Sequence, residues 1–244
     1  GTLAAQDIDS GDSLHWSVVN GDGTYGHLSI DPLSGRWIYS LDNARPATNA
    51  LPAGARVQDS FVVQATDSSG QPVSQRVTID IAGSNDLPVI GGSHQASLTE
   101  DAARHVASGT LTHSDPDTGD TFHWSTVGSN QGQYGDFSFD LGSGKWSYNL
   151  DNARPATDAL GKGQLVQEVF HLAGTDSSGA PVYQDIVIRI TGSNDLPVIS
   201  GSSRGTVTED ATAHMATGVL THQDPDSGDH FSWSLLSGQG TYGT

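Results

Sequence analysis

The sequence predicts an all-β fold in which Greek-key β-sandwich domains follow one another end to end. Two observations carry this prediction. Segments of the chain recur with a period of about 109 residues, and each copy consists of short runs rich in β-branched and aromatic residues, separated by Gly, Asp, Ser and Pro. A period this long fits a whole domain rather than a solenoid unit, so each copy is expected to have its own core.

The repeat is clearest in an Asn-Asp-Leu-Pro-Val-Ile segment, which starts at Asn85 and again at Asn194, a spacing of 194 − 85 = 109 residues. Residues 42–48 return at 151–157 with the same spacing. These correspondences predict a partial repeat without its first strand over 1–90, a complete repeat over 91–199 and a truncated repeat over 200–244. The chain is therefore expected to be a fragment.

Seven runs in the complete repeat favour strands, as is typical of a β-sandwich. They lie at about 93–99, 104–114, 121–128, 133–140, 144–150, 164–174 and 181–191. The loop over 151–163 is expected to hold one helical turn near 156–160. Because inward packing of aromatic rows is commoner than sugar binding, five residues are expected in the core. They are Leu111, Phe122, Trp124, Trp146 and Phe170.

The composition narrows the function classes. The chain has 28 Asp and Glu against 10 Lys and Arg, a net charge of −18, which repels nucleic acid and anionic membranes. It has no cysteine, and no stretch is long and apolar enough to span a bilayer. The first residues do not resemble a signal peptide. Neither a nucleic-acid partner nor membrane insertion is expected.

Strand direction predicts where the acidic residues meet. If every connection reverses the chain, alternate turns collect at the same end of the domain. The first predicted junction contains Asp42, Asn85, Asp86, Asp115, Asp117 and Asp176. The second contains Glu100, Asp151, Asn194, Asp195, Asp224 and Asp226. Asp7, Asp9 and Asp67 occupy the equivalent acidic positions in the first copy and complete the predicted metal-ligand set.

Such carboxylates favour bound Ca²⁺. Each pair of carboxylates about 5 Å apart costs roughly 1–3 kcal/mol, and a hard divalent cation removes that repulsion. Calcium accepts six to eight loosely arranged oxygen ligands, whereas magnesium prefers a smaller octahedral site. The absence of cysteine argues against structural zinc. Asp, Pro and Gly also suit ordinary solvent turns, but their convergence at both linkers favours calcium.

Several motifs resemble two related families. Residues 62–67 (VVQATD), with Gly70, Pro72 and the linker at 85–88, resemble the end of a cadherin repeat. The VCBS repeat is similar over essentially the whole chain, through YGDFSFD at 134–140, GKW at 144–146, LDN at 150–152 and GSNDLPVI at 192–199. The resemblance implies a cadherin/Ig-like sandwich and an extender array of a large bacterial RTX-type adhesin, exported by type I secretion.

The cadherin resemblance also implies ligand roles. Asp115 and Asp117 match the paired acidic motif, and Asp176 matches its later Asp. Glu100 matches the early Glu, Asp151 the mid-domain Asp, and the two Asn-Asp pairs the linker motif. The chain departs from the pattern at five positions, which implies fewer ions per junction. These are Gly83, Gly192, Leu87, Leu196 and Ala153.

The leading functional hypothesis is a calcium-rigidified extender of a secreted, cell-surface bacterial adhesin, which projects adhesive domains for surface attachment or biofilm formation. Its partners would be neighbouring repeats of the same chain. The alternative is a ligand-binding module that recognises a glycan or a second copy. An enzyme is not expected, because the ten histidines are scattered and no nucleophile elbow or phosphate loop is present.

Overall fold

A computed structural model describes residues 1–8, 13–212, 214–238 and 240–241. Asp9 lies outside the described residues. The chain forms two compact units, each of which contains one four-residue helix. The first unit comprises 1–91, 113–123 and 174–182, and the second comprises 92–112, 124–173 and 183–244.

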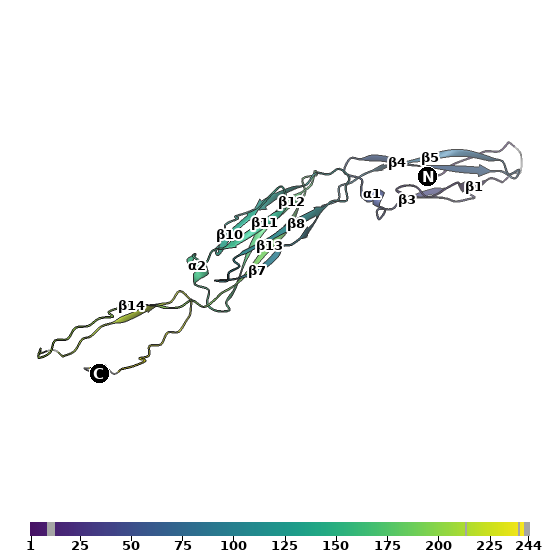
Figure 1. Ribbon diagram of the computed structural model, residues 1–244. Helices are drawn as coiled ribbons and strands as arrows, with labels where there is room; N and C mark the ends of the chain where they lie inside the picture. Colours follow the sequence, from purple (N-terminus) through teal and green to yellow (C-terminus); the bar gives the residue numbers. More distant parts are fainter. Residues whose placement is uncertain (9–12, 213, 239, 242–244) are drawn as a thin grey trace. The chain divides into compact units, whose positions relative to one another are not determined.

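The first unit packs two antiparallel sheets on one core. One sheet has the order β1-β4-β5, and β2 and β3 form a separate hairpin (Figure 1). The elements are β1 (His15–Val18), β2 (Gly26–Ile30), β3 (Trp37–Leu41), α1 (Pro46–Asn49), β4 (Arg56–Thr66) and β5 (Pro72–Ala82). Leu28, Phe61, Val63 and Val77 form the centre of the core, because alternate residues of each strand face inward.

Residues 89–191 form two four-stranded sheets, with orders β10-β11-β8-β6 and β7-β13-β12-β9. The elements are β6 (Val89–Gly92), β7 (Gln95–Thr99), β8 (Val106–Ser114), β9 (His123–Val127), β10 (Gly135–Phe139), β11 (Lys145–Leu150), α2 (Pro155–Asp158), β12 (Leu165–Thr175) and β13 (Pro181–Thr191). The seven predicted strands are found as β7–β13, and the predicted helical turn as α2. The all-β sandwich is confirmed.

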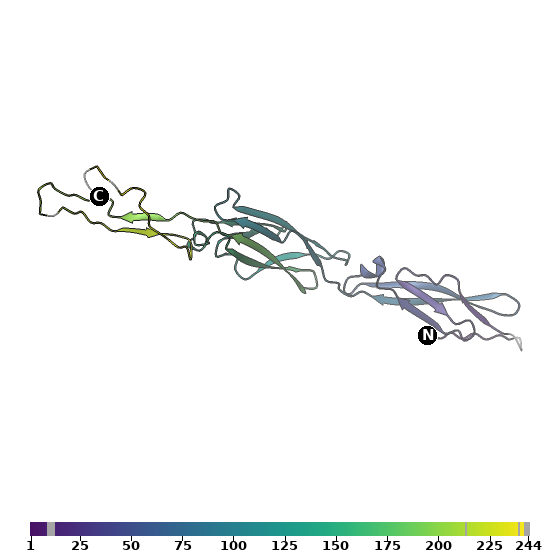
Figure 2. The same ribbon diagram turned by 90° about the horizontal axis from the view of Figure 1, so that it is seen from below.

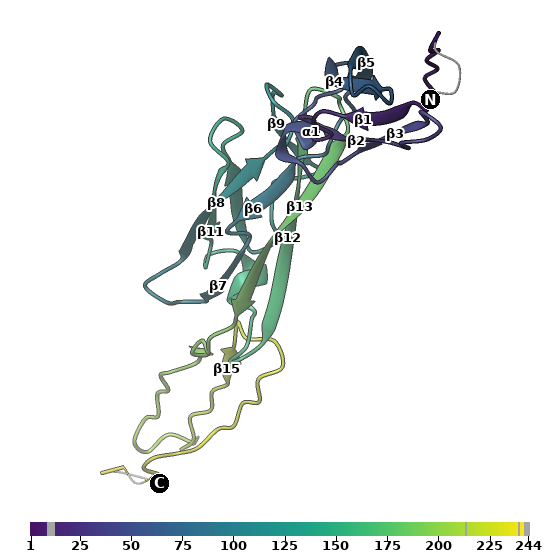
Figure 3. The same cartoon turned by 90° about the vertical axis from the view of Figure 1, so that its right-hand side faces the viewer.

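Strand directions agree with the reversal at every connection. β7 and β13 run parallel, with Val187 opposite Gln95 and Thr191 opposite Thr99. β12 and β13 are neighbours in this sheet and lie side by side in Figure 3. The last strand therefore runs in the direction of the first, and its end meets the end of β7, where Glu100 lies.

The expected first strand differs from the structure in one respect. The chain forms β6 in one sheet and then crosses to the other sheet as β7. Gly92 permits the crossing, because its φ is +95° and a Cβ there would lie 2.3 Å from the Thr110 carbonyl oxygen. Gly201 repeats this conformation, with φ +107° and a Cβ distance of 2.2 Å to the Val219 oxygen.

The predicted core is confirmed for four of its five residues. Leu111, Trp124, Trp146 and Phe170 are buried. Phe122 is only half-buried, because its ring stacks on His113 at 3.8 Å and 9° near the surface rather than pointing into the core.

The described residues after 191 contain one strand pair, β14 (Val198–Gly201) with β15 (Leu220–Gln223). Figure 2 shows the rest of this stretch as irregular segments. Large side chains such as Met215 and Leu235 are exposed there.

Candidate metal centres

A short acidic turn follows β8. The Asp115 carboxylate accepts a hydrogen bond from the backbone N–H of Asp117 at 2.9 Å, which closes an Asx turn. Gly119 then adopts a φ of +88°, and this allows the chain to bend toward β9. The turn at Asp224 repeats this contact at 3.1 Å, since its sequence is nearly the same.

The linkers attach to these turns through one backbone hydrogen bond. The N–H of Asp86 donates to Oδ2 of Asp117 at 2.8 Å. The N–H of Asp195 donates to Oδ2 of Asp226 at the same distance. Each linker aspartate is thereby held beside the acidic turn that lies about thirty residues ahead of it in the sequence, as predicted from strand direction.

The first acidic cluster consists of Asn85, Asp86, Asp115, Asp117, Asp120 and Asp176. Oxygen atoms of Asp115, Asp120 and Asp176 lie within 4.8 Å of one another. The Asn85 amide donates to Oδ2 of Asp176 at 3.0 Å, while Ser178 donates to its Oδ1. These hydrogen bonds lower the pKa of Asp176, the Ser178 hydroxyl having the largest effect, so this carboxylate stays charged.

The other carboxylates of the first acidic cluster are poorly compensated. Asp117 is 4% exposed, and its Oδ1 is buried without a hydrogen-bond partner among the described residues. The same holds for Oδ2 of Asp115 and Oδ2 of Asp120. Burial, followed by the charges of Asp86, Asp115 and Asp120, raises the pKa of Asp117.

The second acidic cluster consists of Glu100, Asp101, Asn152, Asp195, Asp224, Asp226 and Asp229. Glu100 is 2% exposed and accepts the N–H of Ser193 at 3.0 Å. Burial raises the pKa of Glu100, and the charges of Asp195 and Asp101 add to this effect. Burial and the charge of Asp101 likewise raise the pKa of Asp195.

Unpaired oxygens recur in the second acidic cluster. Oδ1 of Asp226, which is 5% exposed, and Oδ2 of Asp195 are buried without a hydrogen-bond partner in the described part of the chain. Oδ1 of Asn152 is unpaired in the same sense, although its amide group donates to Asp101 at 3.1 Å. Both clusters therefore present oxygen ligands, most of them anionic, of the kind that a hard divalent cation binds.

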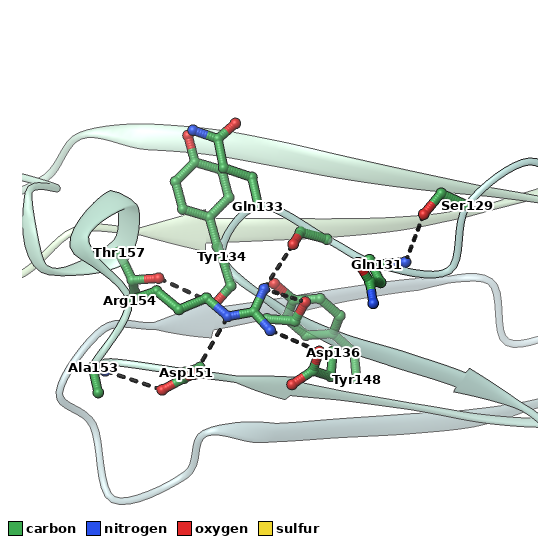
Figure 4. A network of polar contacts seen from close by, with 12 residues as sticks. Ser129, Gln131, Gln133, Tyr134, Asp136, Tyr148, Asp151, Ala153, Arg154 and Thr157 are labelled. Carbon is green, nitrogen blue, oxygen red and sulfur yellow. Dashed lines mark hydrogen bonds and ion pairs between the residues drawn. The ribbon is translucent and has the colours of Figure 1, made fainter.

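Two predicted ligands are engaged elsewhere. Asp151 accepts the N–H of Ala153 and pairs with the guanidinium of Arg154 at 3.3 Å (Figure 4). Asp42 makes the same two contacts with Ala44 and Arg45. Arg154 also donates to the Gly132 and Gly135 carbonyls, so this loop holds the chain around Tyr134 in place.

The remaining predicted ligands lie apart from the two clusters or at their margin. Asp67 accepts hydrogen bonds from Ser69 and Gln71 in its own turn. Asp7 and Asp67 both line one surface hollow of the first copy. Asn194 is exposed and its amide donates to the Asp195 carbonyl. The metal roles of these residues stay predictions.

The sequence interpretation passed over five residues near the clusters. Asp120 and Asp229 end the two acidic turns, so the repeat itself could have identified them. Asp101 adopts a left-handed φ of 54°, which turns the chain after Glu100 and which no sequence pattern reveals. Asn152 reaches the cluster because of the α2 loop, and the charge of Asp158 acts on Asp195.

The glycines that replace a linker aspartate have a steric cause. A Cβ at Gly83 would lie 2.4 Å from the Pro52 carbonyl oxygen, and one at Gly192 would lie 2.2 Å from that of Leu160. The linker therefore runs against the loop after α1 or α2 with no room for a side chain. A second contact ties these loops to the acidic turns: Thr118 N–H donates to Ala50 O at 3.1 Å, and Ser227 N–H to Ala159 O at 3.2 Å.

The strand arrangement and the acidic turns together identify the class of domain. Antiparallel sheets, a parallel first and last strand, and acidic turns beside each linker are those of a cadherin-like β-sandwich repeat. The family model of the bacterial cadherin-like domain matches residues 1–83 and 85–192, so the chain belongs to that family. Cadherin-like domains are commonly extracellular modules that act in adhesion or as extenders, not as enzymes. The VCBS and RTX parts of the resemblance stay predictions.

Solved cadherin structures are similar to the chain at low identity. Human CDH23 EC21-23 is 15% identical with a TM-score of 0.48, over 93% of this chain and 78% of that one. Protocadherin Gamma B7 domains 1–4 are 20% identical with a TM-score of 0.47, over 87% of this chain and 50% of theirs. No curated protein matches the chain. None of the described helices has the length and apolarity needed to cross a bilayer.

Proposed function

We propose that this chain is a calcium-rigidified extender region of a secreted, cell-surface bacterial adhesin. The observation that carries the proposal is the buried, unpaired carboxylate oxygen of Asp117 and of Asp226. Each lies beside a linker whose aspartate N–H occupies the other oxygen of the same carboxylate. A buried anionic oxygen without a donor is costly, and a cation would compensate it.

Calcium is the cation that the ligands favour. Asp115, Asp117, Asp120 and Asp176 would hold it at the first acidic cluster, with the linker fixed beside them. Glu100, Asp195, Asp224, Asp226 and Asp229 would do so at the second. Only oxygen ligands are present, and Ca²⁺ tolerates the irregular set that they form better than Mg²⁺ does. Bound calcium would supply positive charge that neutralises the carboxylates and ties each linker to its acidic turn.

The consequence would be stiffness that depends on the compartment. Extracellular calcium modules often bind at roughly 10⁻⁴–10⁻³ M, so the linkers would be braced outside the cell and loose inside it. A loose chain suits type I secretion, and a braced one suits the display of adhesive domains in surface attachment or biofilm formation. The near absence of Lys, with two in 244 residues, leaves few cations in the chain to compete for the carboxylates.

The test is a calcium titration of the whole chain. Calorimetry should show saturable binding, and small-angle scattering should show a longer, less flexible particle in calcium than in chelator. Magnesium at the same concentration should have a much smaller effect. Unchanged dimensions and an unchanged unfolding temperature on addition of calcium would remove the proposal.

Homophilic or glycan contacts are the second candidate role. Their separate test is a glycan array together with sedimentation in calcium and in chelator. Calcium-dependent dimers or a saturable glycan signal would support a recognition role beside the extender role.

A further inference from the structure

The three copies of the acidic turn differ in one pair of residues beside it. In the second copy His113 stacks on Phe122 at 3.8 Å and 9°. In the third, His222 stacks on Phe231 at 3.9 Å and 10°. Ahead of Tyr134, equivalent residues of the first two copies lie 108 rather than 109 positions apart. Ala5 and Leu14 therefore stand at these two positions in the first copy (113 − 108 = 5 and 122 − 108 = 14). The first copy thus lacks the stacked rings.

A third position changes with this pair. Gly174 faces Phe122, and a Cβ there would lie 2.2 Å from the Cζ of that ring. The first copy has Ala65 instead, which is buried. A phenyl ring in the place of Leu14 would therefore meet the Ala65 methyl group. All three positions thus differ together between the first copy and the second.

A surface hollow of about 410 Å³, which we call the Trp16 pocket, lies at these positions of the first copy. Ala5 and Leu14 both line it, together with Leu3, Trp16 and Ala65. Its volume lies in the range of small-molecule sites, and its lining mixes polar and apolar residues with the indole ring of Trp16, which is 9% exposed.

Charge in the wall of the Trp16 pocket favours a cationic ligand. Asp7 and Asp67 both line it. Asp67 is held in its turn by hydrogen bonds from the Ser69 and Gln71 N–H groups. A hollow whose lining combines apolar side chains, an indole ring and carboxylates suits a ring that carries an ammonium group.

We propose that the Trp16 pocket binds a small aromatic cation. The ring would lie in this hollow against Leu3, Leu14 and Trp16. The ammonium group would lie toward Asp67. Asp7 and Asp67 are also predicted metal ligands, so the binding of this cation is tested without calcium.

The probe is tryptamine, with 3-methylindole as the ring without the amine. Both are titrated in chelator against the ¹⁵N-labelled full chain, and the indole N–H of Trp16 is followed by NMR. We expect saturable shifts with a dissociation constant in about the millimolar range for tryptamine, and at least fivefold weaker binding of 3-methylindole.

Two variants test the location. The triple variant A5H/L14F/A65G rebuilds the ring pair of the second copy and should weaken tryptamine binding at least tenfold. Asp67→Asn keeps the hydrogen bonds of the turn and should weaken tryptamine binding about fivefold, while the binding of 3-methylindole stays unchanged. This second variant also tests the location if the triple variant does not fold. The proposal is overturned if Trp16 shows no saturable shift up to about 10 mM, or if tryptamine binds both variants as it binds the parent chain.

Discussion

The two acidic clusters share one contact and differ in what surrounds it. In both, a linker aspartate donates its N–H to a buried aspartate at 2.8 Å, and the other oxygen of that buried aspartate has no donor among the described residues. The first acidic cluster adds Asp176, whereas the second adds Glu100, Asp101 and Asn152.

This difference teaches that the linker contact is what the two clusters have in common, whereas Asp176 belongs to the first and Glu100 to the second. The shared contact is accordingly the part to break first, and the flanking residues are the part that should tune affinity.

The largest effect is expected from Asp117→Asn and Asp226→Asn. The new amide group would replace the unpaired oxygen, so calcium affinity at the altered cluster should fall at least tenfold, about 1.4 kcal/mol. In chelator the same changes should raise the unfolding temperature, because they remove a repelling charge. Calorimetry and thermal unfolding measure both.

Asp140→Asn is the matched control for these two variants. Asp140 has a similar turn role, accepting the N–H of Gly142 at 2.8 Å, but it is exposed and belongs to neither cluster. If this variant lowers calcium affinity as strongly as the other two, the loss of affinity comes from the change in net charge and not from the shared contact.

The next effect is expected from Gly83→Ala and Gly192→Ala. The added methyl group would enter the space of a carbonyl oxygen at 2.4 Å or 2.2 Å, so each change should destabilise its repeat by about 1–3 kcal/mol. Denaturant unfolding measures this loss. Gly54→Ala, where a Cβ meets no atom but φ is +82°, separates backbone strain from the clash.

Lowering the pH in the presence of chelator should stabilise the two clusters to different extents. A raised folded-state pKa means that the folded chain binds more protons than the unfolded one, so stability rises as the pH falls through that pKa. The second acidic cluster contains two carboxyl groups with a raised pKa, Glu100 and Asp195. The first acidic cluster has one carboxyl group with a raised pKa, Asp117. The pKa of Asp176 is lowered, so its contribution to stability changes only as the pH falls below the ordinary value of 3.8.

Between neutral pH and the ordinary carboxyl values of 3.8 and 4.5, the Asp195 N–H should therefore gain more protection from hydrogen exchange than the Asp86 N–H. Rates are corrected for their intrinsic pH dependence. Equal gains at the two amides would contradict the assignment. With calcium present the trend should reverse, because protons displace the cation.

The smallest effect is expected from Asp151→Asn. The carboxylate pairs with Arg154, which is also held by two backbone carbonyls and Asp136. We expect a stability loss below about 1 kcal/mol and a calcium affinity within twofold of the parent chain. A tenfold loss of affinity would instead support the role of Asp151 as a ligand.

The sequence pattern predicted much of the fold and part of the candidate metal site. Strand runs were found because alternation survives in a half-buried sheet, and strand direction placed Asp86 beside Asp117. The crossing at Gly92 was missed, because the residues on both sides of it favour strands equally. The Arg154 contacts of Asp151 were missed because strand direction places Asp151 only at one end of the domain, whereas the ion pair depends on loop geometry.

The parallel pairing of β7 with β13 has a mechanical consequence. Tension that enters ahead of β7 and leaves after β13 pulls these neighbours in opposite directions along their common axis. The pairs from Gln95 with Val187 to Thr99 with Thr191 would then be loaded together in shear, rather than opened one after another from an end. A chain that projects cargo into flowing water would resist drag through this pair of strands.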